Sequence, residues 1–234
     1  MDPLLMLVLS FFVILLNHPV TQKLDLLTQH EPANVLLLTA HPDDECMFFA
    51  PTLLALLAAQ PPPQVFSLCL SVGNADGLGA TRREELERSL DVLGIEDGRR
   101  WVGTPGQLHR DLGPADIAAV LYPYVAEHHI STILTFDHQG ISSHPNHASL
   151  PHGVVHMLAA DASSPKPLRP TPRVFALETV PLSSKYLGFF APLFRKASIS
   201  MEPYTGKIFK NAPAQPVAFV WFRWLYVAFS RTCG

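Results

Sequence analysis

Two short polar segments hold most of the residues in this chain that could do chemistry. The first reads HPDDE, from His41 to Glu45, and directly follows a short apolar run. The second reads HPNH, from His144 to His147, and lies much later in the chain. A charged side chain buried in a core costs several kcal/mol unless it is paired or bound to a metal. These segments therefore predict a binding or catalytic site.

Imidazoles and carboxylates in such groups are typical ligands of catalytic zinc, which takes three protein ligands and leaves one position for water. His41, Asp44 and His147 would supply two neutral imidazoles and one carboxylate. Asp43 would remain beside the metal as a general base that takes a proton from water, although a helix N-cap is a simpler role for it. The same ligands also suit iron, manganese or cobalt.

Three further polar residues are expected near this site. His144, three residues before His147, could when protonated donate to a developing oxyanion. Asp137 is the natural partner that would hold this histidine charged and oriented. Asn74 follows the second predicted strand and is a candidate substrate contact.

Alternating strands and helices are expected to position these residues. Buried strands are predicted at 35–40, 65–72, 101–104, 131–137 and 174–180, and helices at 47–60, 81–94, 114–129 and 147–161. Thr81 and Glu84 have the spacing of a capping box that would begin the second helix, and Gly94 would end it. The alternation predicts an α/β, Rossmann-like three-layer domain with a mostly parallel sheet. Ligands of such sheets bind beyond the carboxyl ends of the strands.

The two ends of the chain suggest a membrane. Hydrophobic residues make up 48% of the chain and charged residues only 16%, against about a quarter charged in soluble domains. Residues 1–20 are predicted to be a hydrophobic membrane anchor, with a removed signal peptide as the alternative, and 21–33 a tether. Residues 34–234 would form the domain. Its aromatic and basic segment at 217–231 suits a lipid headgroup interface or a C-terminal core helix.

Composition also narrows the partners. The net charge of −3 has no polyanion-binding signature, so nucleic acid is not an expected partner. The cysteines form no regular framework and no Asn-x-Ser/Thr sequon occurs, which favours a reducing compartment.

The motifs resemble a known family. AHPDDE with SHPNH resembles the LmbE-like, or PIG-L, superfamily of zinc-dependent de-N-acetylases. The stretches MFFAPT, SLCLSVGN, TRREEL, SKYLG and WFRWLYVAFSR resemble its eukaryotic branch, which acts on N-acetylglucosaminyl-phosphatidylinositol in glycosylphosphatidylinositol (GPI) anchor synthesis. The likeness covers residues 34–231. One departure is Ser143, where the family often has a glycine before the second histidine motif.

The resemblance implies metal-assisted hydrolysis of an acetamide to acetate and a free amine. It implies a glycolipid substrate held in the endoplasmic reticulum membrane, with the catalytic domain on the cytoplasmic face, and it leaves protein partners unknown. A substrate-contacting arginine falls on Arg82, whose guanidinium could clamp a phosphate. The remaining family roles fall on these residues: zinc ligands His41, Asp44 and His147, general base Asp43, and oxyanion donor His144.

Three alternatives stay open. A de-N-acetylase of a soluble N-acetylglucosaminide would use the same site without needing the hydrophobic ends. A catalytically inactive subunit that binds a sugar lipid would lack a ligand or the base, and none is lacking. Phosphoester hydrolysis more often assembles two metals, and a second carboxylate-rich ligand set is not evident.

Overall fold

The computed structural model describes residues 33–103, 113–165, 167–177 and 179, together with residues 2, 3, 6, 7 and 10. The chain divides into Leu26–Thr179 and a second unit of Met1–Asp25 with Val180–Gly234, and all the elements named below belong to the first. The predicted anchor, tether and aromatic segment at 217–231 lie almost entirely outside the described residues, so the domain boundaries stay predictions. Within the described part of the chain, no helix is both long and apolar enough to cross a bilayer.

A parallel sheet forms the centre of this unit. Its described strands are in the order β3-β2-β1-β4-β5, and every pairing is parallel. The strands are β1 Asn34–Thr39, β2 Gln64–Cys69, β3 Arg100–Val102, β4 Thr132–Phe136 and β5 Arg173–Leu177. Strand β4 is buried at every residue and β1 at all but its first, as expected for a parallel sheet covered on both faces. The predicted α/β fold with a mostly parallel sheet is confirmed.

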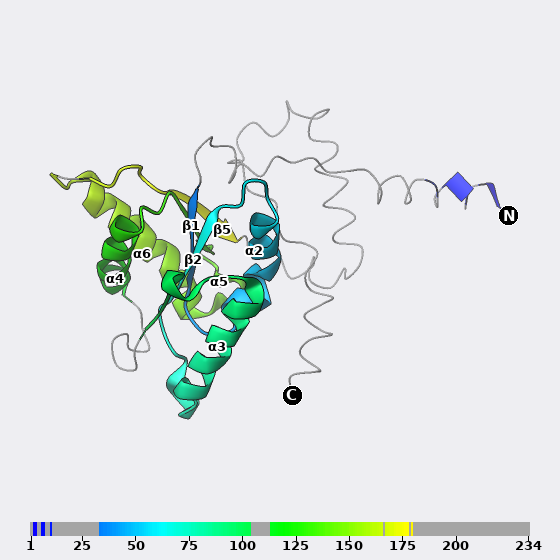
Figure 1. Cartoon of the computed structure of the whole chain (residues 1–234), viewed down its shortest axis with the longest axis horizontal. Helices are drawn as coiled ribbons and strands as arrows, with labels where there is room; N and C mark the ends of the chain where they lie inside the picture. Colours follow the sequence, from blue (N-terminus) through cyan, green and yellow to red (C-terminus); the bar gives the residue numbers. More distant parts are fainter. Residues whose placement is uncertain are drawn as a thin grey trace. The chain divides into compact units, whose positions relative to one another are not determined.

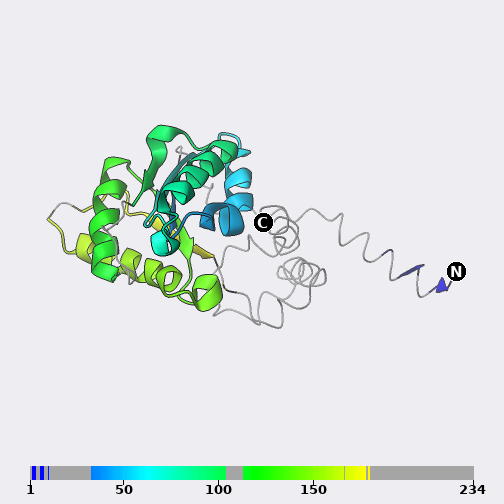
Figure 2. The ribbon, with the colours of Figure 1, turned by 90° about the horizontal axis from the view of Figure 1, so that it is seen from below.

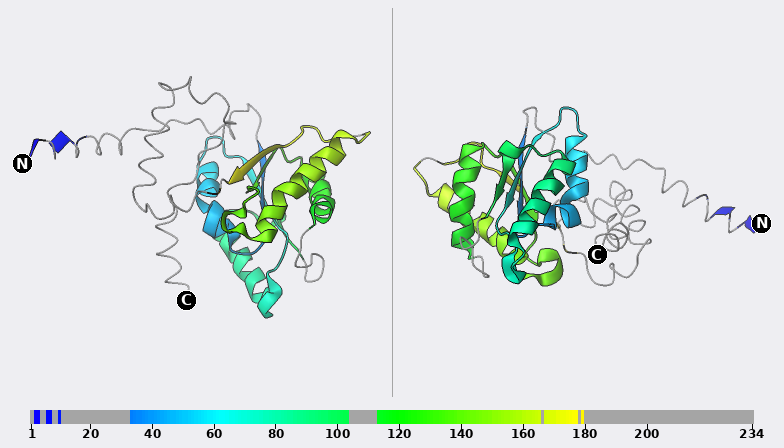
Figure 3. Two further views of the ribbon diagram at one scale, coloured as in Figure 1. Left: turned by 180° about the vertical axis from the view of Figure 1, so that it is seen from behind. Right: turned by 60° about the horizontal axis from the view of Figure 1, so that its bottom comes forward.

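Helices cover the two faces of the sheet. Helices α2 (Ala50–Leu57) and α3 (Gly79–Leu93) lie on one side in Figure 1, and α4 (Pro114–Glu127) and α6 (Pro145–Ala162) lie on the other. The turned views in Figures 2 and 3 show the same three layers. Crossovers between parallel strands are right-handed, so the direction of the chain along the sheet decides which face a helix covers. The chain moves outward from β1 to β3 and then returns to pair β4 with the opposite edge of β1, which places the earlier and later helices on opposite faces. The short helices are η2 Glu45–Phe49, η3 Asn74–Asp76, η4 Asp97–Arg99 and α5 Gly140–Ser143.

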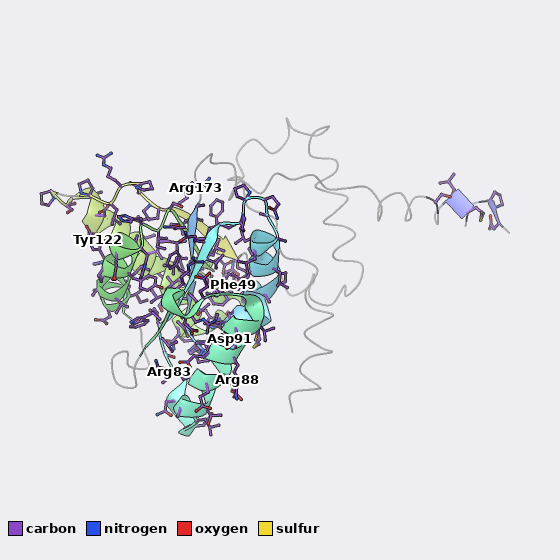
Figure 4. All side chains as sticks on the ribbon, viewed as in Figure 1. Phe49, Arg83, Arg88, Asp91, Tyr122 and Arg173 are labelled. Carbon is purple, nitrogen blue, oxygen red and sulfur yellow. The ribbon has the colours of Figure 1, made fainter. Side chains whose placement is uncertain are left out.

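Side chains fill the space between these layers (Figure 4). Phe49, labelled there, is only 3% exposed, whereas Arg83 and Asp91 on α3 are exposed. Helix α6 packs closely on α4. Gly153 of α6 lies so near Ile117 of α4 that an added Cβ would collide with the isoleucine side chain. This close packing matters for function, since α6 carries the second histidine motif.

The prediction for the start of α3 was wrong. Thr81 does not cap the helix, which begins at Gly79 with Leu78 at the N-cap and no side-chain cap from that residue. Instead, Asn74 Oδ1 accepts the Gly79 N–H at 2.8 Å, so one free donor of the first turn is satisfied from five residues upstream. The predicted end at Gly94 is confirmed by its left-handed φ of 80°.

Two other helices begin earlier than expected. The helix predicted to start at residue 47 opens with the π-helical turn η2 at Glu45 and continues as α2, with Pro51 in its first turn. Helix α6 begins at Pro145 rather than at residue 147, and His144 is its N-cap. As a result, Asp44 is the N-cap of η2 and His147 lies in the first turn of α6.

Candidate active site

The two polar motifs meet at the carboxyl ends of β1 and β4. From β1 the chain runs to β2 and β3 on one side, while β4 and β5 lie on the other, so the strand order reverses between β1 and β4. In sheets of this kind, ligands usually bind at such a switch point, beyond the carboxyl ends of the strands. Residues 40–45 follow β1, and residues 137–147 follow β4. This topology brings distant parts of the sequence together.

The ligand atoms of the predicted metal site converge on one nitrogen. Asp44 Oδ1 lies 3.1 Å from His147 Nε2, and His41 Nδ1 lies 3.3 Å from the same atom. The second oxygen of Asp44 accepts the backbone N–H groups of Ala40 and His41, at 3.1 and 3.0 Å. Asp44 is therefore anchored to the end of β1 and keeps one oxygen directed at the histidines.

These distances suit a tetrahedral metal. Ligand atoms about 2.0–2.1 Å from a zinc ion lie about 3.3 Å from one another, close to the 3.1 and 3.3 Å found here. Two imidazoles and one carboxylate also form a donor set typical of catalytic zinc. The ring nitrogens of His41, His144 and His147 lie within 4.8 Å of one another, so His144 stands at the same centre. The side chains present fit a divalent metal.

His147 is held in one orientation by its surroundings. Its Nδ1–H donates to the Gly140 carbonyl at 3.2 Å, which leaves Nε2 for the site, as is usual for a metal-ligating histidine. The ring stacks on Phe136, the last residue of β4, with centroids 4.2 Å apart and planes 4° apart. Phe48 packs edge-on to both rings. The ligand therefore has little freedom to rotate.

The other two histidines are oriented by backbone and amide groups. The N–H of Asn146 donates to His144 Nδ1 at 3.3 Å, so the neutral ring of His144 carries its proton on Nε2. The side-chain nitrogen of Asn146, Nδ2, lies 3.0 Å from His41 Nε2. With the amide turned by 180°, its oxygen would take this place, accept an Nε2–H and leave His41 Nδ1 free to bind a metal.

Each of the three consecutive carboxylates has a different partner. Asp44 faces His147, whereas Asp43 Oδ2 pairs with the Arg82 guanidinium at 3.1 Å. Arg82 also donates to the Gly73 carbonyl at 3.1 Å. Glu45 is buried and accepts the backbone N–H of Asp43 at 2.9 Å. Asp43 has a φ of 91°, which is uncommon for a non-glycine residue and is often found at functional sites.

The site shifts several pKa values. Burial, with repulsion from His147 and His144, lowers the pKa of His41 to about 4. Burial, then the nearby His147, also lowers the pKa of His144. Burial alone would lower the pKa of His147, but the hydrogen bond and charge of Asp44 outweigh it and raise this pKa. Burial, with the neighbouring Asp44, raises the pKa of Asp43 against the opposing effect of Arg82. Two of the three histidines are thus neutral at neutral pH.

Two predicted site residues have structural partners. Asp137 accepts hydrogen bonds from the amides of Gln139 and Gly140 and from Thr179. Among the described contacts it does not pair with His144, so its predicted role as the partner of that histidine has no support there. Asn74 caps α3 through its side-chain oxygen, and its role in binding substrate stays a prediction.

Sequence reasoning missed four residues that shape the site: Phe136, Gly140, Asn146 and Thr179. Asn146 and Gly140 lie inside or close to the second histidine motif, and that proximity was the available signal. Phe136 ends the apolar run of β4, which reads as core. Thr179 had no signal, because it follows β5 and reaches the site only through the folded sheet.

Solved structures define the class of fold. The chain resembles N,N′-diacetylchitobiose deacetylase from Pyrococcus horikoshii with a TM-score of 0.53 and 16% sequence identity, over 84% of this chain and 83% of that one. This likeness shows a shared α/β fold of the kind found in that deacetylase.

Sequence comparison then defines the family. Residues 36–158 match the family described as PIG-L: GlcNAc-PI de-N-acetylase. The N-acetylglucosaminyl-phosphatidylinositol de-N-acetylase of Bos taurus is 36% identical over 209 residues, covering 85% of this chain and 80% of the bovine protein. The "Probable N-acetylglucosaminyl-phosphatidylinositol de-N-acetylase" of Schizosaccharomyces pombe is 36% identical over 160 residues, covering 67% of this chain and 61% of the fission-yeast protein. The chain belongs to the GlcNAc-PI de-N-acetylase family.

Proposed function

We propose that this protein removes the N-acetyl group of N-acetylglucosaminyl-phosphatidylinositol, giving glucosaminyl-phosphatidylinositol and acetate in GPI-anchor biosynthesis. The observation that carries the proposal is the convergence of His41 Nδ1 and Asp44 Oδ1 on His147 Nε2 in a chain of this family. A divalent metal, zinc in our proposal, would be held by His41, Asp44 and His147. When bound, it would acidify a water molecule and polarise the acetamide carbonyl.

Asp43 is the residue that we assign to proton transfer. Its carboxylate is half exposed, at 48% of the side chain, so water and substrate can reach it. It takes a proton from the attacking water and later delivers a proton to the leaving amine. The left-handed backbone at Asp43 and the bond from its N–H to Glu45 hold the carboxylate apart from the neighbouring Asp44.

His144 is the candidate donor to the developing oxyanion. Because the N–H of Asn146 occupies its Nδ1, the neutral ring presents an Nε2–H, and the lowered pKa favours this neutral form. The expectation of a protonated donor therefore becomes a proposal for a neutral one, as an oxyanion hole needs a directed N–H rather than a full charge. No titration of His144 is then required for the donor role.

Arg82 is the candidate contact for the substrate phosphate. Its bonds to Gly73 and Asp43 use two of the five N–H donors of a guanidinium, and its side chain is 32% exposed. The other donors can meet a phosphate near the site. We further propose that the protein works at the endoplasmic reticulum membrane with this site on the cytoplasmic side. The glycolipid substrate is its expected partner.

The test measures acetate released by the full chain from the glycolipid in mixed micelles, beside the lipid-free head group. Release from the glycolipid that stops with a strong chelator and returns with zinc supports a metal-dependent de-N-acetylase. Faster release from the lipid-free head group would favour the alternative, a de-N-acetylase of a soluble N-acetylglucosaminide. If zinc-loaded, folded protein released no acetate from either compound, the enzymatic proposal would be wrong.

A further inference from the structure

The loop that delivers both histidines of the second motif has an unusual backbone. Gly140, Ile141 and Ser143 have φ values of 59°, 60° and 59°. The left-handed region is uncommon for non-glycine residues and most unusual for a β-branched residue such as isoleucine. Such a residue is strained, and it persists only where its surroundings hold it. The holding contacts are therefore part of the site.

Thr179, beyond the end of β5, supplies two of these contacts through one hydroxyl. Its Oγ1 donates to Asp137 Oδ1 at 2.7 Å and accepts the N–H of Ile141 at 2.9 Å. Its own N–H donates to Asp137 Oδ2 at 2.7 Å. Asp137 in turn accepts the amide of Gly140 at 2.9 Å. Two successive amides of the strained loop are thus tied to this threonine and its aspartate.

A single planar peptide links Thr179 to the metal centre. The Ile141 N–H and the Gly140 carbonyl belong to the same peptide unit, whose atoms lie in one plane and point in opposite directions. Thr179 holds the N–H end, while His147 Nδ1 donates to the carbonyl end at 3.2 Å. Rotation of this peptide would break both bonds together. The orientation of His147 therefore depends on the threonine hydroxyl.

We propose that Thr179 is a positioning residue for the metal ligand His147, acting through the Gly140–Ile141 peptide. Thr179 lies outside the residues 36–158 that match the family, so the inference comes from the fold. The expected effect of Thr179 on metal binding rests on the proposed function, whereas its expected effect on the orientation of the His147 ring does not.

The test compares full-length variants in detergent micelles. Thr179→Val removes the hydroxyl and keeps the shape, whereas Thr179→Ser keeps the hydroxyl, and Thr179→Ala replaces the valine variant if that one does not fold. Ser131→Ala is a matched control, because the Ser131 hydroxyl donates to the Asn34 carbonyl at the amino end of the sheet. Zinc affinity is measured by competition with a chromophoric chelator, and folding by thermal unfolding of the metal-free protein.

Thr179→Val should weaken zinc binding roughly 10-fold, as expected when support for a metal ligand is lost. Thr179→Ser and Ser131→Ala should stay within about twofold of the parent, because both keep the hydroxyl at residue 179 that supports the metal ligand. Equal affinity of the valine variant and the parent would overturn the proposal. So would an equal loss in the serine variant, because the hydroxyl would then not be responsible.

A second readout needs neither metal nor substrate. In metal-free protein labelled with 15N-histidine, the His147 Nδ1–H should exchange with solvent faster in Thr179→Val than in the parent and Thr179→Ser. An unchanged His147 signal would overturn the positioning role. If the parent bound no zinc at all, the proposed metal-dependent function would fail, and this comparison would still decide the role of Thr179.

Discussion

Replacing Gly140 with alanine should weaken zinc binding about 10- to 100-fold, the usual range for losing support of a metal ligand. A Cβ at Gly140 would lie 2.8 Å from His147 Cβ and 2.8 Å from the Ala148 nitrogen. Ordinary contact begins at 3.4 Å, so His147 and the first turn of α6 would have to separate from Gly140 by about 0.6 Å (3.4 − 2.8). Metal sites tolerate only about 0.2 Å in ligand distance, so even half of that movement is too much.

Gly77→Ala is a matched control for the backbone cost. Gly77 has a φ of 75°, and no heavy atom of the described residues lies within 4 Å of the Cβ it would gain. Both variants therefore lose roughly 1–2 kcal/mol of stability from a left-handed alanine. Only Gly140→Ala adds the collision, which should destabilise by a further 1–3 kcal/mol, roughly the cost of overpacking.

The assay pairs zinc competition with thermal unfolding of the metal-free proteins. The expected result is a large loss of zinc affinity in Gly140→Ala and none in Gly77→Ala, with both variants folded. Equal zinc affinities in two folded variants would refute the reasoning, because the His147 ligand would then not depend on the space beside Gly140.

Three further changes test other parts of the site. Asp43→Asn should lower acetate release by at least about 100-fold, the usual contribution of a general base. Zinc affinity and folding should be kept, because asparagine tolerates the φ of 91°. Activity near the parent level would exclude Asp43 as the base. Arg82→Gln should raise the KM for the phosphate-bearing substrate, whereas Arg83→Gln, which loses only a surface pair with its i,i+4 neighbour, should leave it unchanged. Ser143→Gly should stabilise the protein, by less than about 1 kcal/mol, since glycine adopts the φ of 59° without strain but has a more flexible unfolded chain; urea unfolding that shows a lower stability would contradict the argument.

Residue types and spacing were enough to predict the strands and the convergence of the two motifs. Strands β1 and β4 are apolar runs of the right length, and polar residues after parallel strands must share one edge of the sheet. The ends of helices were harder to predict. Thr81 matched a capping pattern, but the cap comes from Asn74, which the turn η3 brings to Gly79. Local patterns do not include such upstream partners.

The partner of Asp137 could not be deduced for a similar reason. An aspartate after a strand can turn toward a nearby histidine or back onto its own loop. Here the turn that follows presents the amides of Gln139 and Gly140, and β5 places Thr179 on the other oxygen. That placement depends on pairing of β4 with β5, which a sequence motif does not contain. Ser143 did carry a signal, because the glycine usual there in the family indicates the left-handed backbone that the serine adopts.

The order of the three carboxylates in HPDDE also has a structural reason. Adjacent like charges repel, and burial already raises the pKa values of Asp43 and Glu45, so each side chain needs a partner of its own. The left-handed φ of Asp43 turns its carboxylate to Arg82, while Asp44 faces His147 and Glu45 returns to the Asp43 amide. Glu45 thus stabilises the strained turn that separates the proposed base from the proposed ligand. One turn of backbone therefore gives the three adjacent carboxylates three different interaction partners.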